Sequence, residues 1–287
     1  ETLLAVKEEY DAEPKAGIAC AMKNAGLGVG VPDFGRCRLI IKDGKAHIAT
    51  SASCMGQGIG TVATQIFCDV TGLSIDDVIY DTADTFFTPD SGNTTASRQT
   101  VITGEAVRMA SQHLRDAMTS KRLDELNGEQ YYAEFESVTD KIGTAKEHPV
   151  SHIAYSYATQ LCLLDDDGKV KKILAAHDVG QAVNPQNVEG QIEGGVVMSM
   201  GYALTENFPL LDSVPTAKFG TLGLLHSTMV PEIQTVIIKS DDNDGIACGA
   251  KGVGEIAAIP GAPAIQLAYY NRDKIFRTKL PLEKTPY

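Results

Sequence analysis

The sequence predicts a mixed α/β (α+β) fold built as two lobes of mixed sheets with packed helices. Strand-like and helix-like hydrophobic patterns alternate along the chain, tight turns join paired strand segments, and a polar stretch separates two such mixed regions. We therefore expect a first α/β lobe over 1–125, a linker region over 126–149 and a second α/β lobe over 150–287. With 43% hydrophobic residues in 287, the chain can bury a sizeable core.

The first lobe should contain a β-hairpin, a helix, a short strand and a second helix. The hairpin turn is Asp43-Gly44, a dipeptide that tolerates positive φ, and Gly72 follows the first helix as a stop signal. The expected bounds are Arg36–Ile41 and Ala46–Ser51 for the hairpin strands, Ile59–Val70 for the first helix, Val78–Thr82 for the strand and Ile102–Ala117 for the second helix.

The second lobe should contain another hairpin, a long helix, a strand and a closing helix. In the long helix, Gly190, Gly194 and Gly201 each cost about 1 kcal/mol unless a ligand or a neighbour approaches the backbone closely. The expected bounds are Ile153–Leu164 and Val170–His177 for the hairpin strands, Pro185–Leu204 for the long helix, Ile233–Lys239 for the strand and Pro263–Tyr270 for the closing helix.

Charge and composition exclude several classes of function. The formal net charge of −12 argues against a nucleic-acid partner. No apolar run approaches the roughly 20 residues that span a bilayer, and the first residues do not resemble a signal peptide, so we expect a cytoplasmic protein without membrane contact. The six cysteines form no C-x-x-C pair, which argues against an iron–sulfur cluster in this chain.

Two segments immediately before expected helices are candidate binding loops. They are Gly56-Gln57-Gly58 and Thr94-Thr95-Ala96-Ser97, and the free N–H groups of a helix start favour an anion such as phosphate. The side-chain amides of Gln57 and Gln191 could match the edge of a heterocycle. Alternatively, the first segment is only a tight turn and the second only caps a helix.

Glu255 is the candidate catalytic base. It ends the glycine-rich segment Gly249-Ala250-Lys251-Gly252-Val253-Gly254-Glu255 and is followed by apolar residues, so its carboxylate should be partly desolvated and suited to abstracting a proton. The alternative is a carboxylate at a helix start that the helix dipole stabilises. Lys251 could pair with Glu255 or contact a ligand.

Two further motifs do not support a site. The run Gly26-Leu27-Gly28-Val29-Gly30 is similar to a dinucleotide fingerprint, but a strand is expected after it where that fingerprint needs a helix. The pair His177-Asp178 has no other histidine at a metal-ligand spacing. We therefore expect no metal ligated by the protein.

Several segments, taken in order, resemble the molybdopterin-binding subunit of the xanthine dehydrogenase and aldehyde oxidase family of molybdenum hydroxylases. The resemblance runs from about Ala16 to about Tyr270 and covers only the last part of that subunit. Since the first residue is not Met, we also expect residues upstream. The segments that carry the resemblance are Met55–Gly58, Asp90–Arg98, His177–Gly180, Asn184-Pro185, Gly190–Gly194 and Gly249–Glu255.

The resemblance implies a molybdenum ion held by the dithiolene of a pterin and not by the protein. It implies that Glu255 is the base that activates the oxygen nucleophile, with water as the oxygen source. The residues matched to cofactor contacts, or to backbone passing beside the metal, are Gly56, Gln57, Gly58, Thr94, Thr95, Ala96, Ser97, Gln191, Lys251, Gly252, Val253 and Gly254.

The implied reaction is oxidation of a purine or another N-heterocycle such as xanthine or hypoxanthine, which the run Thr94 to Arg98 favours. Oxidation of an aldehyde or of carbon monoxide is the alternative, and a cofactor-binding or assembly module without catalysis is a third. The cofactor would be molybdopterin, in its cytosine dinucleotide form in a bacterial source. Iron–sulfur clusters and FAD would lie on other segments or subunits of an oligomeric enzyme.

The N-terminal half of the molybdenum subunit is the main partner that the resemblance implies. In the family, much of the substrate pocket lies in that half. We therefore expect this chain to carry half a site, to hold no cofactor when isolated and to be inactive alone.

Overall fold

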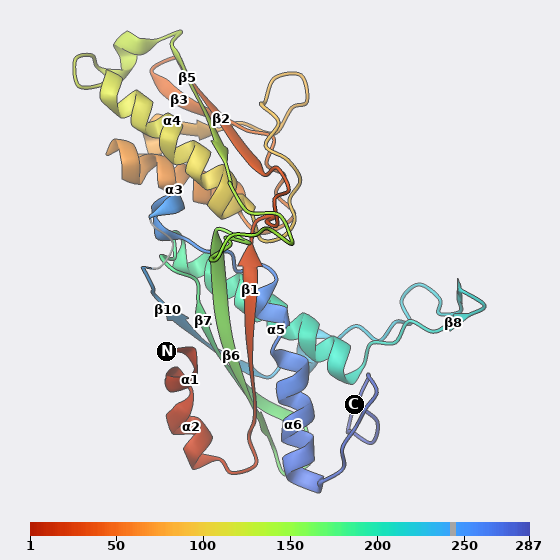
Figure 1. Cartoon of the computed structure of the whole chain (residues 1–287). Helices are drawn as coiled ribbons and strands as arrows, with labels where there is room; N and C mark the ends of the chain where they lie inside the picture. Colours follow the sequence, from red (N-terminus) through yellow and green to blue (C-terminus); the bar gives the residue numbers. More distant parts are fainter. Residues whose placement is uncertain (242–244) are drawn as a thin grey trace.

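Two four-stranded sheets form the two lobes, one above the other in Figure 1. The computed structural model describes residues 1–241 and 245–287. The upper sheet has the strand order β4-β3-β2-β5, and the lower sheet has the order β1-β6-β7-β10. The expected mixed α/β fold is confirmed.

The upper lobe begins with the predicted hairpin, in which β2 and β3 pair up to Lys42 and Lys45. Asp43 and Gly44 have φ values of 52° and 72°, the left-handed turn that the dipeptide predicts. β4 joins β3 in parallel and β5 joins β2 antiparallel. The bounds are β2 (Phe34–Lys42), β3 (Lys45–Ala49), α3 (Ile59–Thr71), β4 (Val78–Tyr80), η2 (Gln99–Thr103), α4 (Gly104–Ala117) and β5 (Gln130–Glu136).

Helices α3 and α4 cover one face of the upper sheet. Alternate residues of β2, including Leu39 and Ile41, point to this face and are buried against Phe67 of α3 and Leu114 of α4. Helix α3 ends as predicted, because Gly72 adopts φ 75° and its N–H donates to the Cys68 carbonyl.

The lower lobe holds the second predicted hairpin, β6 and β7, between the edge strands β1 and β10. β10 runs parallel to β7, whereas the other neighbours are antiparallel. The bounds are α1 (Thr2–Ala5), α2 (Lys7–Ala12), β1 (Gly17–Ala25), β6 (Ala154–Leu164), β7 (Val170–Asp178), α5 (Pro185–Leu204), β10 (Glu232–Ile238) and α6 (Gly261–Asp273).

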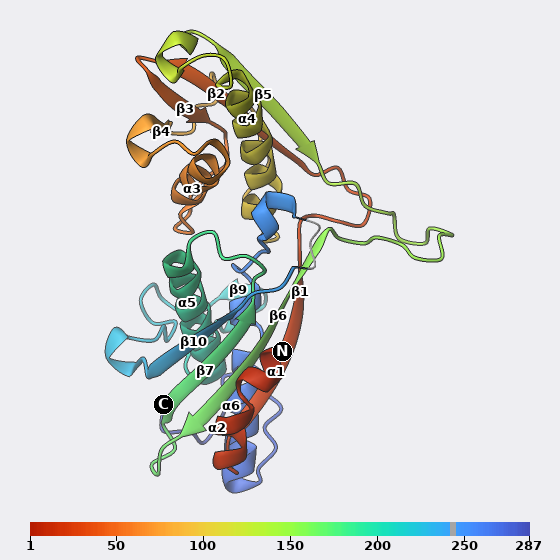
Figure 2. The same ribbon diagram turned by 90° about the vertical axis from the view of Figure 1, so that its left-hand side faces the viewer.

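Helices lie on both faces of the lower sheet (Figure 2). Ile173 and Ala175 of β7 face the core formed with α5 and α6. Leu174 and Ala176 face the opposite side, where Val6 between α1 and α2 packs against them. This alternation follows from the two-residue period of a strand.

The lobe boundaries differ from those that the sequence pattern suggested. β1 lies within 1–125 but pairs with β6 of the lower sheet, from Gly17 opposite Cys162 to Ala25 opposite Ala154. β5 lies within 126–149 but belongs to the upper sheet, opposite β2. Both strands find partners that are distant in the sequence, which a local pattern does not reveal.

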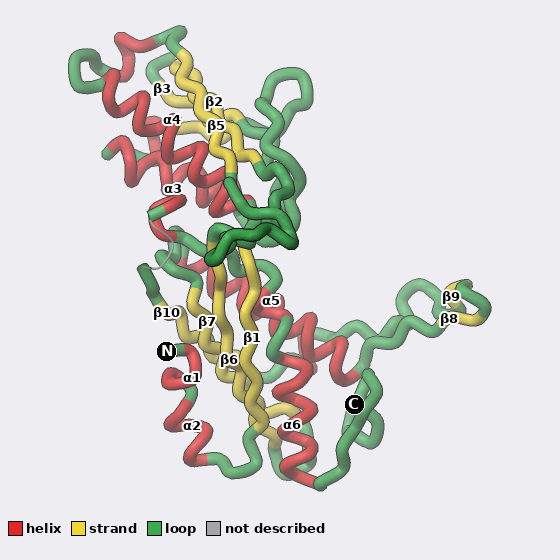
Figure 3. The backbone as a smooth tube through the Cα atoms, viewed as in Figure 1, coloured by secondary structure: helices red, strands yellow, loops and turns green. Residues whose placement is uncertain are grey.

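An arm between α5 and β10 projects from the lower lobe and carries the short hairpin of β8 (Leu210–Leu211) and β9 (Val214–Pro215) (Figures 1 and 3). Over the described residues, no helix has the length and apolar character needed to cross a membrane. The remaining short helices are η1 (Ile75–Asp77), η3 (Leu123–Leu126), η4 (Ser227–Met229), η5 (Ile246–Gly249) and η6 (Ile256–Ala258).

Candidate functional site

The candidate segments meet where the two lobes touch. At this seam, Ala25 and Ala154 of the lower lobe pack against Val101 and Ile102 of the upper lobe. The Asn184 amide at the start of α5 donates to the Gln65 amide oxygen of α3 over 2.9 Å. Two further hydrogen bonds cross the seam. The Gly26 N–H donates to the Ala96 carbonyl over 3.0 Å, and the Ala247 N–H donates to the Glu105 carboxylate over 2.7 Å.

Gln57 shapes its own loop through its side-chain amide. Its Oε1 accepts from the Met55 N–H over 2.7 Å, and its Nε2 donates to the Ser53 carbonyl over 2.9 Å. The Thr94 hydroxyl donates to the same Ser53 carbonyl over 2.8 Å, so the two predicted binding loops lie against each other. Over the described part of the chain, one N–H of Nε2 and one lone pair of Oε1 have no hydrogen-bond partner, so the role of Gln57 towards a heterocycle stays a prediction.

Cys54 occupies the start of α3, a position that the sequence reasoning missed. The N–H group of Gly56, and then those of Gly58 and Ile59, donate to the Cys54 sulfur and lower the pKa of its thiol. The side chain is exposed. Backbone N–H groups at this helix start thus face the Cys54 sulfur, and the binding of an anionic ligand by this loop stays a prediction.

Arg98 holds the 91–97 loop in place. Its fully buried guanidinium donates to the Asp33 carboxylate over 2.6 Å and to the Ser91 and Asn93 carbonyls over 2.7 and 3.0 Å. In the same loop, Ala96 and Ser97 both have φ 49°, a left-handed conformation that costs energy for residues other than glycine. The buried ion pair holds this loop in a shape that it would not adopt alone.

The starts of α3 and α5 approach each other across the seam. A Cβ atom placed on Gly58 would lie 2.6 Å from the Asn187 amide nitrogen, and Gly58 has φ 75°, a left-handed conformation that favours glycine. Asn184 caps α5 by accepting the Asn187 N–H over 2.8 Å. Gln191 lies one helical turn beyond Asn187 and is partly exposed.

Lys251 pairs with Asp178 and not with Glu255. Its Nζ lies 2.9 Å from Asp178 Oδ2, and both side chains are almost fully buried. The Lys251 side chain is therefore turned away from a ligand at the seam. Gly252 packs tightly against the upper loop, because a Cβ there would lie 2.6 Å from both the Cβ and the carbonyl oxygen of Ser97.

Glu255 lies at the seam and is bound from both lobes. Its Oε2 accepts a hydrogen bond from the Ser97 hydroxyl over 2.8 Å and lies 3.1 Å from Lys23 Nζ. The Glu255 N–H donates in turn to the Ser97 oxygen over 3.2 Å. The side chain is 47% exposed, so the expected desolvation is not present in this chain.

Lys23 was also missed by sequence reasoning. It lies on β1, far before Glu255 in the sequence, and no local pattern joins the two residues. Among the described residues, no three His, Cys, Asp or Glu side chains come together in a group that could hold a metal ion.

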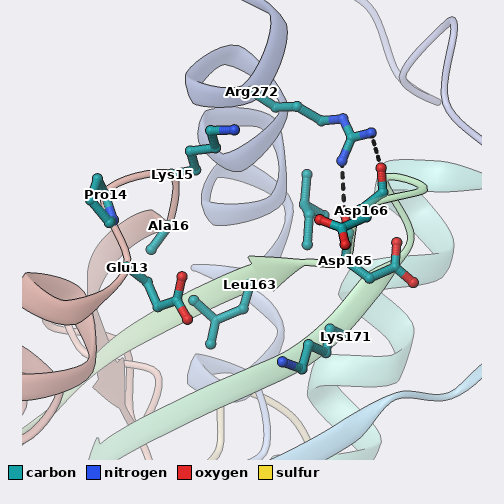
Figure 4. Close-up of a pocket in the computed structure, with 10 residues that line it drawn as sticks. Glu13, Pro14, Lys15, Ala16, Leu163, Asp165, Asp166, Lys171 and Arg272 are labelled. Carbon is teal, nitrogen blue, oxygen red and sulfur yellow. Dashed lines mark hydrogen bonds between the residues drawn. The ribbon is translucent and has the colours of Figure 1, made fainter.

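The pocket in Figure 4 lies away from this site. It occupies about 340 Å³ between the α2–β1 connection and the β6–β7 turn. Arg272 in its wall donates to the backbone carbonyls of Asp165 and Asp166, which fixes the turn. None of the candidate site residues lines this pocket.

The chain is similar in sequence to part of a curated protein. A probable xanthine dehydrogenase subunit of Bacillus subtilis is 28% identical over 308 residues, which cover 93% of this chain and 40% of that protein. The chain thus spans about 40% of the length of that curated relative.

Solved structures share the fold. The aldehyde oxidoreductase of Desulfovibrio desulfuricans superimposes with a TM-score of 0.78 at 26% identity, over 94% of this chain and 32% of that one. The aldehyde oxidoreductase of Desulfovibrio gigas has a TM-score of 0.81 at 23% identity, over 96% of this chain and 34% of that one, and shows the fold alone. Residues 3–231 match the family described as the molybdopterin cofactor-binding domain. The chain therefore belongs to the molybdopterin cofactor-binding domain family.

Proposed function

We propose that this chain is the part of a molybdenum-dependent hydroxylase that holds one side of the molybdopterin cofactor and supplies the catalytic base, Glu255. The observation that carries the proposal is the meeting of four separate segments at the seam. The loops at 53–58 and 91–97 and the start of α5 surround one region, and the 249–255 segment brings Glu255 to it.

The residues at the seam fit a pterin with a phosphate-bearing tail. Two helix starts, those of α3 and α5, approach one another, and helix starts favour phosphate groups. No atom of the described chain would lie within 4 Å of a Cβ on Gly56 or Gly190, so a ligand can reach the backbone there. Gln191 and the exposed Thr95 add polar groups beside this space. We propose that the other residues matched by resemblance contribute mainly through their backbone.

Glu255 would act as the general base. When bound, the cofactor supplies the redox centre at which a carbon of the substrate is hydroxylated, with oxygen from water. The carboxylate of Glu255 takes the proton of the oxygen nucleophile. Ser97 holds Glu255 from the upper lobe, which sets the direction from which the proton is taken.

The substrate that we favour is a purine or a related N-heterocycle. The run Thr94 to Arg98 and the name of the Bacillus relative support this class. The name of the Desulfovibrio desulfuricans enzyme supports an aldehyde as the second candidate. Iron–sulfur clusters and FAD would be carried by other segments or subunits, since the described cysteines are scattered and unpaired.

Replacement of the base tests the proposal. In the complete enzyme, E255Q keeps the size of the side chain but removes the base, so kcat should fall by about 10²- to 10⁴-fold while cofactor content is unchanged. E283Q, at an exposed glutamate near the C-terminus, is the matched control and should keep full activity. Unchanged turnover in E255Q would remove Glu255 from the reaction.

A further inference from the structure

We propose that Lys23 is a positioning residue for the base: it fixes Oε2 of Glu255 by an ion pair, so that Oε1 is the oxygen which takes the proton. This inference rests on the proposed function of Glu255. It adds a second residue that acts through Glu255 and contacts neither cofactor nor substrate.

Lys23 lies where β1 reaches the seam. It is opposite Ser156 of β6 in the sheet register, and the Ser156 hydroxyl donates to the Gly252 carbonyl. The same pair of strands thus holds the partner of the base and the backbone of the segment that carries the base. Because both contacts come from a paired sheet, their spacing is rigid.

The contacts of Lys23 indicate its role. Its Nζ donates hydrogen bonds to the Asn24 carbonyl at 3.0 Å and to Asn24 Oδ1 at 3.4 Å, and it forms an ion pair with Glu255 Oε2 at 3.1 Å. The hydrogen bonds to Asn24 anchor the ammonium group beside Glu255.

The two oxygens of the Glu255 carboxylate differ. Oε2 accepts a hydrogen bond from the Ser97 hydroxyl and forms the ion pair with the Lys23 ammonium. Across 1–241 and 245–287 the structure records no hydrogen bond to Oε1. An oxygen that accepts a hydrogen bond and faces a cation is a poorer proton acceptor than its neighbour without these contacts, so we assign the proton to Oε1.

Lys23 places a positive charge on one side of the carboxylate, beside Oε2. His152 lies near Lys23, but burial and then the charge of Lys23 lower the pKa of its imidazole, so it is neutral at pH 7. The buried ammonium of Lys251 faces Asp178. Lys23 and Glu255 are 22% and 47% exposed, and water screens such a pair, so we expect a modest effect.

The first test measures the contact without any cofactor. This chain as purified is labelled with a limiting amount of acetic anhydride, and acetylation of each lysine is measured by mass spectrometry. E255Q removes the charged partner, so Lys23 should react about two- to fivefold faster than in the wild type. Lys45, an exposed lysine on β3, serves as the internal control. An unchanged rate at Lys23 would show that the ion pair does not form.

The second test measures the role in the complete enzyme. K23M should lower kcat about three- to tenfold and leave KM for the heterocycle unchanged, because the base is misdirected while substrate binding persists. K23R restores a cation and should recover most of kcat, and K45M should match the wild type. A raised KM with normal kcat in K23M would overturn the positioning role in favour of substrate binding. A full loss in E255Q together with a wild-type kcat in K23M would reject this inference and keep the proposed function.

Discussion

The buried imidazole of His177 on β7 should make the stability of the chain depend on pH. Burial lowers the pKa of His177 to about 4, against an ordinary value of 6.5. The unfolded chain therefore binds a proton at a higher pH than the folded chain does. The contribution of His177 to the free energy of unfolding is fully present above pH 6.5 and is lost as the pH falls from 6.5 towards 4.

Urea unfolding at pH 7.5 and pH 5 measures this effect. The wild type should lose on the order of 2 kcal/mol more than H177M between the two values, because only the wild type gains a proton on unfolding at that site. H148M removes a histidine that is 92% exposed and should follow the wild type. Equal pH dependence in the wild type and H177M would contradict the predicted cause.

Single residues of the site differ in how far the sequence could predict them. Glu255 was identifiable because an acid stands at the end of a glycine-rich segment, and the structure brings it to the seam. Lys23 could not be identified from the sequence, because its ion pair with Glu255 depends on how β1 pairs with β6. The partner of Lys251 was likewise hidden, since Asp178 reaches it only after the lower sheet has formed.

At the scale of elements, α5 gives a prediction from two adjacent glycines. Nothing in the described chain lies within 4 Å of a Cβ placed on Gly194, whereas a Cβ on Gly195 would lie 2.5 Å from the Ala257 Cβ. G194A should therefore stabilise the chain by about 0.5–1 kcal/mol, because alanine favours a helix over glycine. G195A should destabilise it by about 1–3 kcal/mol through overpacking against η6.

Denaturant midpoints of the two variants test this contrast, and each serves as the control for the other. Destabilisation by G194A would show that the outer face of α5 is already covered in the chain. The exposed face continues one and two turns further at Met198 and Tyr202, which are 68% and 60% exposed.

The elements themselves were predicted unevenly. Both hairpins, α3, α4, α5 and β10 follow from hydrophobic period and turn residues, and the structure confirms them. β1 was not predicted, because a strand with three alanines in nine residues has neither strong strand propensity nor clean alternation of buried and exposed positions. The sequence pattern placed β5 in a polar linker, because its exposed positions include Glu134 and Glu136. Its pairing with β2, which is distant in the sequence, makes it a strand.

At the scale of the whole molecule, the site exists only where the lobes meet. The upper lobe supplies the 53–58 and 91–97 loops, and the lower lobe supplies the start of α5, Glu255 and Lys23. The sequence could single out these segments as candidates but not predict their convergence, because the seam depends on tertiary contacts such as Asn184 with Gln65. When a ligand binds between two lobes, the geometry of its site depends on how the lobes pack against each other.

The open state of the seam leads to a prediction about cofactor binding. Glu255 is 47% exposed and the spaces beside Gly56, Gly190 and Gly194 are empty of the described chain's atoms, so a cofactor here would contact protein on one side only. Ligands held tightly by proteins are usually buried over most of their surface. Elemental analysis and pterin fluorescence of the purified chain should therefore find molybdenum far below one per chain. Adding the N-terminal half of the molybdenum subunit should restore it, and stoichiometric cofactor in the chain alone would show that these segments suffice.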